Sequence, residues 1–117
     1  MVIEYERVLG AFSLLADISE YEARNNEPLV RLSIAQIESY LGQTELTNEQ
    51  LDKVHHAAAA CAYYQYIVVL STREGVDVTF GDAKVTAKDV SIAKIIKDDA
   101  IDVIRQFTYC PVAIEVV

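Results

Sequence analysis

Two adjacent histidines, His55 and His56, are followed shortly by Cys61, a grouping that resembles the start of a metal site. Neighbouring side chains on a helix point about 100° apart, so the two histidines cannot both face one ion, and paired helical ligands usually stand four residues apart. The chain has no third histidine. We therefore predict one buried and one exposed histidine, and no metal site.

The densest group of carboxylates lies near the C-terminal end: Asp98, Asp99 and Asp102, with Asp89 earlier. General acid–base catalysis needs carboxylates in unlike, partly buried environments beside a cleft. These residues follow the polar side of an amphipathic pattern, which favours a solvated helix face; Asp99 is nearest the apolar positions, and we expect it to be partly buried. The four glycines of the chain are too scattered for a phosphate loop or a nucleophile elbow. The sequence predicts no enzyme and no cofactor, and an enzyme hypothesis would depend on Asp99 or His56 beside a cleft.

Three tyrosines, Tyr63, Tyr64 and Tyr66, follow the histidines. They cannot share one face of a helix, so at least one ring projects sideways or outward. Tyrosine combines a large contact area with a polar tip and is enriched at interfaces. Two interpretations stay open: the rings pack against the hairpin or the last helix of this chain, or they contact another subunit.

The helix that carries these residues is predicted over Thr47–Leu70, and the rest of the chain is organised around it. Thr47 and Gln50 have the spacing of a capping box, in which each residue bonds a backbone N–H of the other. Apolar residues and alanines follow at helical spacing. Pro28, after two asparagines, suits the first turn of the preceding helix.

Three other helices are predicted from apolar spacing: residues 3–16, Val30–Leu41 and Asp89–Phe107. The acidic segment between the first two, residues 17–26, is predicted as a loop or a frayed helical turn. The link between the helix that ends at Leu41 and the long helix is short, so we expect these two helices to be antiparallel neighbours.

Residues 76–87 change to a period of two, interrupted by Gly81-Asp82, and this pattern predicts a β-hairpin before the last helix. The register puts every apolar side chain on one face. It pairs Phe80 with Ala83, Val78 with Val85, and Val76 with Ala87. The final residues, 111–117, are β-prone and nearly uncharged, so this tail needs a partner edge.

Composition limits the functional classes. The chain has 117 residues, 52% of them hydrophobic, which is typical of one folded domain. Its net charge of −8 argues against nucleic-acid wrapping as the primary activity and against binding to anionic membranes. We expect no signal peptide, no membrane span, and reduced thiols at Cys61 and Cys110; a disulfide between the two is the minor alternative.

Three segments taken in order point to a family: Ile37–Gly42 (Ile-Glu-Ser-Tyr-Leu-Gly), Ala62–Tyr66 (Ala-Tyr-Tyr-Gln-Tyr) and Phe80–Thr86 (Phe-Gly-Asp-Ala-Lys-Val-Thr). With the order of helices, they make the chain resemble the small head-to-tail connector proteins, also called neck adaptors or head-completion proteins, of tailed bacteriophages and prophages. The acidic segment 17–27 and the histidine pair depart from a typical member.

The resemblance implies a small antiparallel bundle of about four helices with a hairpin inserted before the last helix. It also implies a structural virion protein, made in the bacterial cytoplasm, that forms a ring between portal and tail or stopper proteins and lets DNA pass without sequence-specific binding. The alternative is a helical binding or regulatory module that acts as a homodimer. We expect the oligomer interface to use Tyr63, Tyr64, Tyr66, Val76, Val78, Phe80, Val112, Ile114 and Val116.

Overall fold

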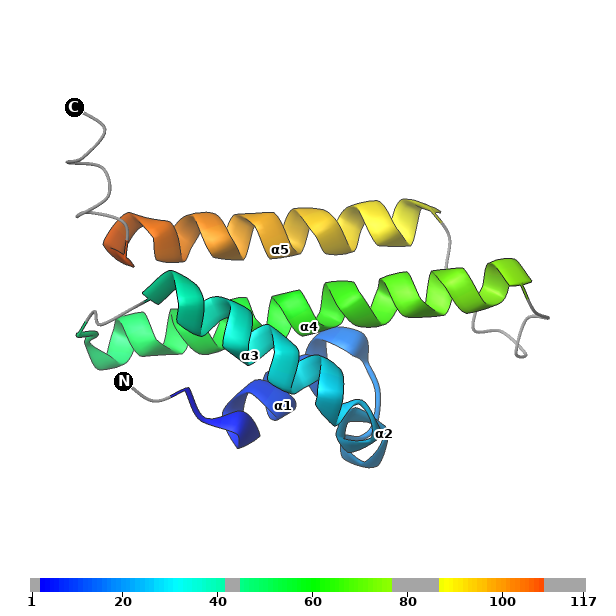
Figure 1. The fold of residues 1–117 in the computed structure, drawn as a ribbon, viewed down its shortest axis with the longest axis horizontal. Helices are drawn as coiled ribbons and strands as arrows, with labels where there is room; N and C mark the ends of the chain where they lie inside the picture. The colour runs from blue at the N-terminus through cyan, green and yellow to red at the C-terminus, as the bar shows by residue number, and fades with distance from the viewer. Residues whose placement is uncertain (1–2, 42–44, 77–86, 109–117) are drawn as a thin grey trace.

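The computed structural model describes residues 3–41, 45–76 and 87–108, and these residues form five α-helices (Figure 1). In chain order they are α1 (Tyr5–Ala16), α2 (Glu20–Asn25), α3 (Glu27–Leu41), α4 (Asn48–Val76) and α5 (Ala87–Thr108). No β-strand occurs within the described ranges. The prediction of a mainly helical fold is confirmed, with one helix more than the sequence indicated.

The longest helix, α4, is the centre of this arrangement and contacts α1, α3 and α5. It begins with the predicted capping box: the Gln50 N–H donates to Thr47 Oγ1 at 3.1 Å, and the Thr47 N–H donates to Gln50 Oε1 at 3.0 Å. Ala57–Ala60 and Ala62 are fully buried. Because these side chains are small, the backbones of neighbouring helices can approach α4 closely on several sides.

α5 lies along one side of α4, while α1, α2 and α3 lie on the other (Figure 1). α3 crosses α4 in the opposite direction, which confirms the antiparallel prediction. Gln36 and Tyr40, near the C-terminal end of α3, share a small hollow with Lys97 and Ile101 of α5. α3 therefore touches both members of the α4–α5 pair.

The core joins all the long helices. Phe12 of α1 meets Tyr66 of α4 edge to face, with ring centroids 5.5 Å apart and an angle of 86° between the ring planes. Such a pair adds about 0.5–1.5 kcal/mol to the area that it buries. The largest side chains that are fully buried are Phe12, Leu9, Ile37, Ile104, Val8, Val30 and Val54.

The helix α2 corrects the prediction of a loop or frayed turn over residues 17–26. Asp17 ends α1 in the left-handed conformation, with φ of 58°, which short polar side chains tolerate better than most. Ser19 then caps α2, because its Oγ accepts the Glu22 N–H at 3.1 Å. Glu20 and Glu22 lie in the first turn of α2, where the helix dipole favours negative charge.

The start of α3 agrees with the position of Pro28 in its first turn. The Asn26 carbonyl accepts the N–H groups of Leu29 and Val30 at 3.0 and 3.2 Å. Its side chain does not cap α3 but donates back to the Glu22 carbonyl at 3.0 Å. Asn26 thus closes α2 and opens α3 at one position.

The predicted pairing of Val76 with Ala87, the outer pair of the hairpin, is wrong. Val76 is the last residue of α4 and Ala87 the first of α5, so both have helical backbone. Gly75, a residue type common just beyond helix ends, lies inside α4, and Ala87 is of the strongest helix-forming type. The other hairpin residues, including Val78 and Phe80, lie outside the described residues. So do Cys110 and the tail residues Val112, Ile114 and Val116.

Candidate functional site

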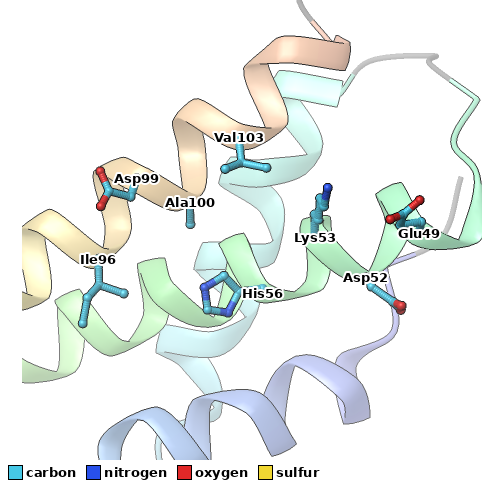
Figure 2. Close-up of a pocket in the computed structure, with 8 residues that line it drawn as sticks. All are labelled: Glu49, Asp52, Lys53, His56, Ile96, Asp99, Ala100 and Val103. Carbon is cyan, nitrogen blue, oxygen red and sulfur yellow. The ribbon is translucent and has the colours of Figure 1, made fainter.

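An open groove of ≈ 550 Å³ lies between α4 and α5 (Figure 2). Ile96, Ala100 and Val103 form its apolar wall on α5, whereas the α4 wall is polar. None of the lining residues belongs to α3, so the groove lies on the side of the α4–α5 pair that α3 does not cover. The complete lining is Glu49, Asp52, Lys53, His56, Ile96, Asp99, Ala100 and Val103.

A second surface lies on the outer side of α5. Ile92 is 43% exposed and Ile95 58% exposed, although both are large and apolar. Lys88, four residues before Ile92, and Asp99, four residues after Ile95, are exposed as well. We call Lys88, Ile92, Ile95 and Asp99 the outer row of α5. Asp99 also lines the groove, so the two surfaces adjoin at this residue. The buried face of the same helix is formed by Ala93, Ala100 and Ile104.

The carboxylates Asp98, Asp99 and Asp102 of α5 lie in different surroundings on the surface of the bundle. Asp99 is exposed, so the expectation of partial burial is wrong, and Figure 2 shows it projecting away from Ala100 and Val103. Asp98 accepts a hydrogen bond from Lys94 at 2.9 Å, which lowers the pKa of this carboxyl, and Lys97 lies 3.4 Å away. Asp102 lies 3.9 Å from Arg105. Asp98 and Asp102 thus lie beside cationic side chains of the same helix, on the polar side that the sequence predicts.

The histidine prediction is confirmed: His55 is 3% exposed and His56 is exposed. The two side chains lie in different environments. His56 lines the groove, whereas His55 Nε2 accepts the backbone N–H of Glu4 at 2.9 Å. Since Nε2 is the acceptor, the neutral ring carries its proton on Nδ1. His55 therefore holds the N-terminal end of α1 on α4.

The three tyrosines point to three different environments. Tyr66 is buried against Phe12 of α1, so it serves the core of this chain, in a place that neither interpretation of the sequence named. Tyr64 lies under the ammonium of Lys97, 4.7 Å from the ring centroid, and so contacts the last helix. Tyr63 is half-buried, seven residues after His56 and hence on the same face of α4. Tyr63 and Tyr64 keep exposed surface, while Tyr66 keeps very little.

Cys61 is a free thiol inside the bundle. Burial raises its pKa to about 11, so it is protonated at neutral pH and is neither a nucleophile nor a ready metal ligand. Among the described residues, no three His, Cys, Asp or Glu side chains come close enough to share an ion. None of the described helices has the length and apolar composition that crossing a membrane requires.

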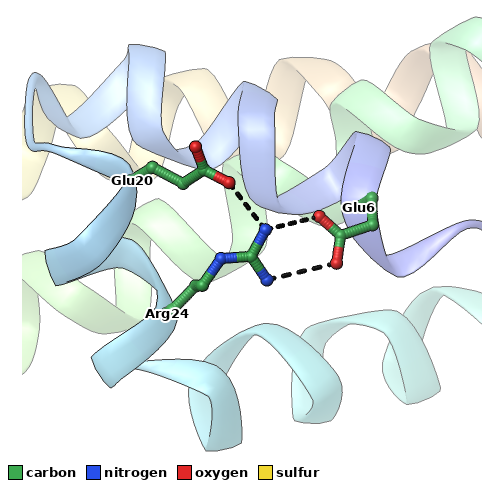
Figure 3. Close-up of polar contacts among 3 residues, drawn as sticks. All are labelled: Glu6, Glu20 and Arg24. Carbon is green, nitrogen blue, oxygen red and sulfur yellow. Dashed lines mark hydrogen bonds and ion pairs between the residues drawn. The ribbon is translucent and has the colours of Figure 1, made fainter.

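The acidic segment 17–27, for which the sequence offered no role, fastens α2 to α1. Arg24 donates to both carboxylate oxygens of Glu6, at 2.8 and 3.2 Å, and to Glu20 at 2.6 Å (Figure 3). The bonds from Arg24 lower the pKa of Glu6. All three side chains are exposed, so this cluster orients α2 more than it stabilises the fold.

Sequence reasoning missed the outer row because Ile92 lies at the apolar spacing that predicted the helix over Asp89–Phe107, and such spacing is usually that of a core-facing stripe. The signal that identifies the row is Ile95, a large apolar residue outside that stripe. Helical spacing shows which residues share a face, but not how many helices will cover it.

Comparison of the chain with protein-family models, with characterised proteins and with solved structures finds no match. The connector resemblance therefore stays a prediction from the sequence.

Proposed function

We propose that this protein is a structural subunit of a phage head-to-tail connector, which assembles as a ring between the portal and the tail and extends the DNA channel. In this proposal its partners are copies of itself, the portal protein and a tail or stopper protein, and its place is the neck of the virion. DNA passes through without being read, and the net charge of −8 keeps a like-charged polymer from adhering to the wall.

The observation that supports the proposal best is that α5 carries two unlike apolar surfaces. In the outer row, Ile92 and Ile95 are exposed on the surface of one helix. The groove beside it is concave and has Ile96, Ala100 and Val103 on one wall. A ring needs heterologous contacts, in which one surface of a subunit meets a different surface of the next. A row that enters the groove of a neighbouring subunit meets that requirement.

Electron microscopy of the protein mixed with the portal protein encoded in the same genome tests this proposal. We expect an additional ring on the portal axis with wild-type protein. Ile95→Glu in the row and Val103→Glu in the groove should each abolish it, because each puts a charge into one half of the contact. Leu14→Glu is the matched control, since Leu14 is 83% exposed on α1, on the other side of α4. A protein that stays monomeric at high concentration and does not bind the portal would contradict the proposal.

A homodimeric binding module is the second candidate, and the outer row favours it too, because a two-fold pair would also cover these isoleucines. The two functions differ in solution: a module keeps a fixed dimer mass when portal is added, whereas a connector subunit transfers to the portal. Sedimentation velocity of the mixture distinguishes them.

A further inference from the structure

The outer row of α5 carries opposite charges at its two ends, so it is complementary to a second copy of itself in the antiparallel direction. Lys88, Ile92, Ile95 and Asp99 follow one another at intervals of four, three and four residues, which is the spacing of the apolar seam in a coiled coil. Lys88 and Asp99 are eleven residues apart, or about 16 Å along three turns of the helix. The row therefore begins with a cation, ends with an anion and has two isoleucines between them.

Neither end of the row is neutralised within the described part of the chain. Lys94, Lys97 and Arg105 of α5 lie within ion-pair distance of Asp98 or Asp102, but no such pair includes Lys88 or Asp99. Both residues are exposed. Among the residues that the structure describes, the row thus lacks partners for its exposed apolar side chains and for its charges alike.

We propose that the free protein pairs with a second copy of itself through this row, with the two α5 helices antiparallel about a two-fold axis between residues 93 and 94. In this register Lys88 of each copy faces Asp99 of the other, and Ile92 of each faces Ile95 of the other. Each of the four residues faces a complementary residue of the other copy. The two-fold axis repeats each contact, as an isologous interface requires.

The charges also exclude the alternative direction. A parallel two-fold pair would set Lys88 against its own copy and Asp99 against its own copy, and like charges placed opposite each other are unfavourable. Other acidic or basic partners lack this symmetry, because they match one end of the row and not the other. A second copy is the occupant that complements both ends.

The pair is a weak one. The overlap of the two helices runs from residue 87 to residue 100, about 20 Å, and such a seam buries less surface than the 1,200–2,000 Å² of a standard stable interface. We expect dissociation in roughly the micromolar range or above. This inference concerns the free protein and holds whether or not the protein is a connector, so its failure would leave the ring proposal standing.

Sedimentation equilibrium over a concentration series tests the proposed dimer, by measuring the dimerisation constant of variants in which the charges of the row are reversed. Lys88→Asp alone and Asp99→Lys alone should each weaken dimerisation by about tenfold or more, because each turns two attractive contacts into two repulsive ones. The double variant Lys88→Asp/Asp99→Lys restores opposite charges at both ends and should recover the wild-type constant. Lys94→Asp is the matched control: it reverses an exposed lysine of the same helix that lies outside both the row and the groove.

Thermal unfolding of each variant verifies that it folds, and Asp is well tolerated at position 88, in the first turn of α5. Ile95→Ser should abolish the dimer, while Leu14→Ser should leave it intact. Wild-type protein that remains monomeric up to about 1 mM would overturn the proposal. A double variant no better than the single ones, or a dimer weakened equally by Lys94→Asp, would overturn it as well.

Discussion

Replacing His55 tests how the N-terminal end of α1 is held on α4. The ring is 3% exposed, and its Nε2 accepts the Glu4 N–H at 2.9 Å, a bond between residues 51 positions apart in the chain. His55→Ala removes this acceptor and the buried ring together. The lost hydrogen bond costs about 1 kcal/mol and the lost burial about 2 kcal/mol. We expect the free energy of unfolding to fall by about 3 kcal/mol.

The pH dependence gives the sharper result. Burial lowers the pKa of His55 below its ordinary value of 6.5, and the Arg7 guanidinium lowers it further, while the Leu51 carbonyl, Glu4 and Asp52 oppose the shift. A group with a depressed folded pKa binds protons more readily in the unfolded chain. Its contribution to stability is therefore present above about pH 6.5 and is lost as the pH falls through the folded pKa. Protonation also gives Nε2 a hydrogen that faces the Glu4 N–H.

Urea unfolding followed by circular dichroism at about pH 7.5 and about pH 5 measures this loss. His55→Gln should lose less stability to acid than wild type, because the amide oxygen can accept the Glu4 N–H but does not titrate. His56→Gln is the control and should lose as much as wild type, since His56 is exposed. Equal acid sensitivity of wild type and His55→Gln would refute the role assigned to His55.

Three further changes have predictable outcomes. Ser33 is fully buried and its Oγ has no hydrogen-bond partner among the described residues, so Ser33→Ala should raise stability by about 1 kcal/mol and Tm by about 4 °C in a thermal melt; a lower Tm would show that the hydroxyl is bonded. Thr47→Ala removes the capping box and should cost about 1 kcal/mol by urea unfolding, whereas Thr47→Ser should cost little. With its pKa raised to about 11 by burial, Cys61 should resist iodoacetamide at about pH 8 in the native protein and react once unfolded, as peptide mass mapping would show; alkylation at equal rates in both states would contradict this.

The features that were predicted well depend on local chemistry. Thr47 and Gln50 are three residues apart, and each has the group that the other's backbone needs, so no distant contact decides the outcome. The division of His55 from His56 follows from helix geometry alone. A single amphipathic pattern likewise predicted α3, and the short link after Leu41 predicted its direction relative to α4.

The errors occurred where a contact from elsewhere in the chain decides the structure. The acidic segment 17–26 is helical because Ser19 caps it, and its orientation against α1 is set by the contact of Arg24 with Glu6, which local sequence does not show. The alternating pattern over residues 76–87 predicted strands at Val76 and Ala87. Each of these residues instead extends the helix beside it, α4 or α5. Asp99 is exposed because α4 covers only one side of α5.

The outer row connects the two proposed assemblies, since one surface cannot serve both at the same time. In the antiparallel pair, each subunit buries its row and leaves its groove open. In a ring, each subunit buries its row in one neighbour and its groove around another, so more apolar surface leaves water per subunit. Binding to a portal would add surface again and would draw subunits out of the weaker pair by mass action. A weak, self-complementary seam therefore suits a subunit that must stay apart from its ring until a template is present, because it covers Ile92 and Ile95 without holding them irreversibly.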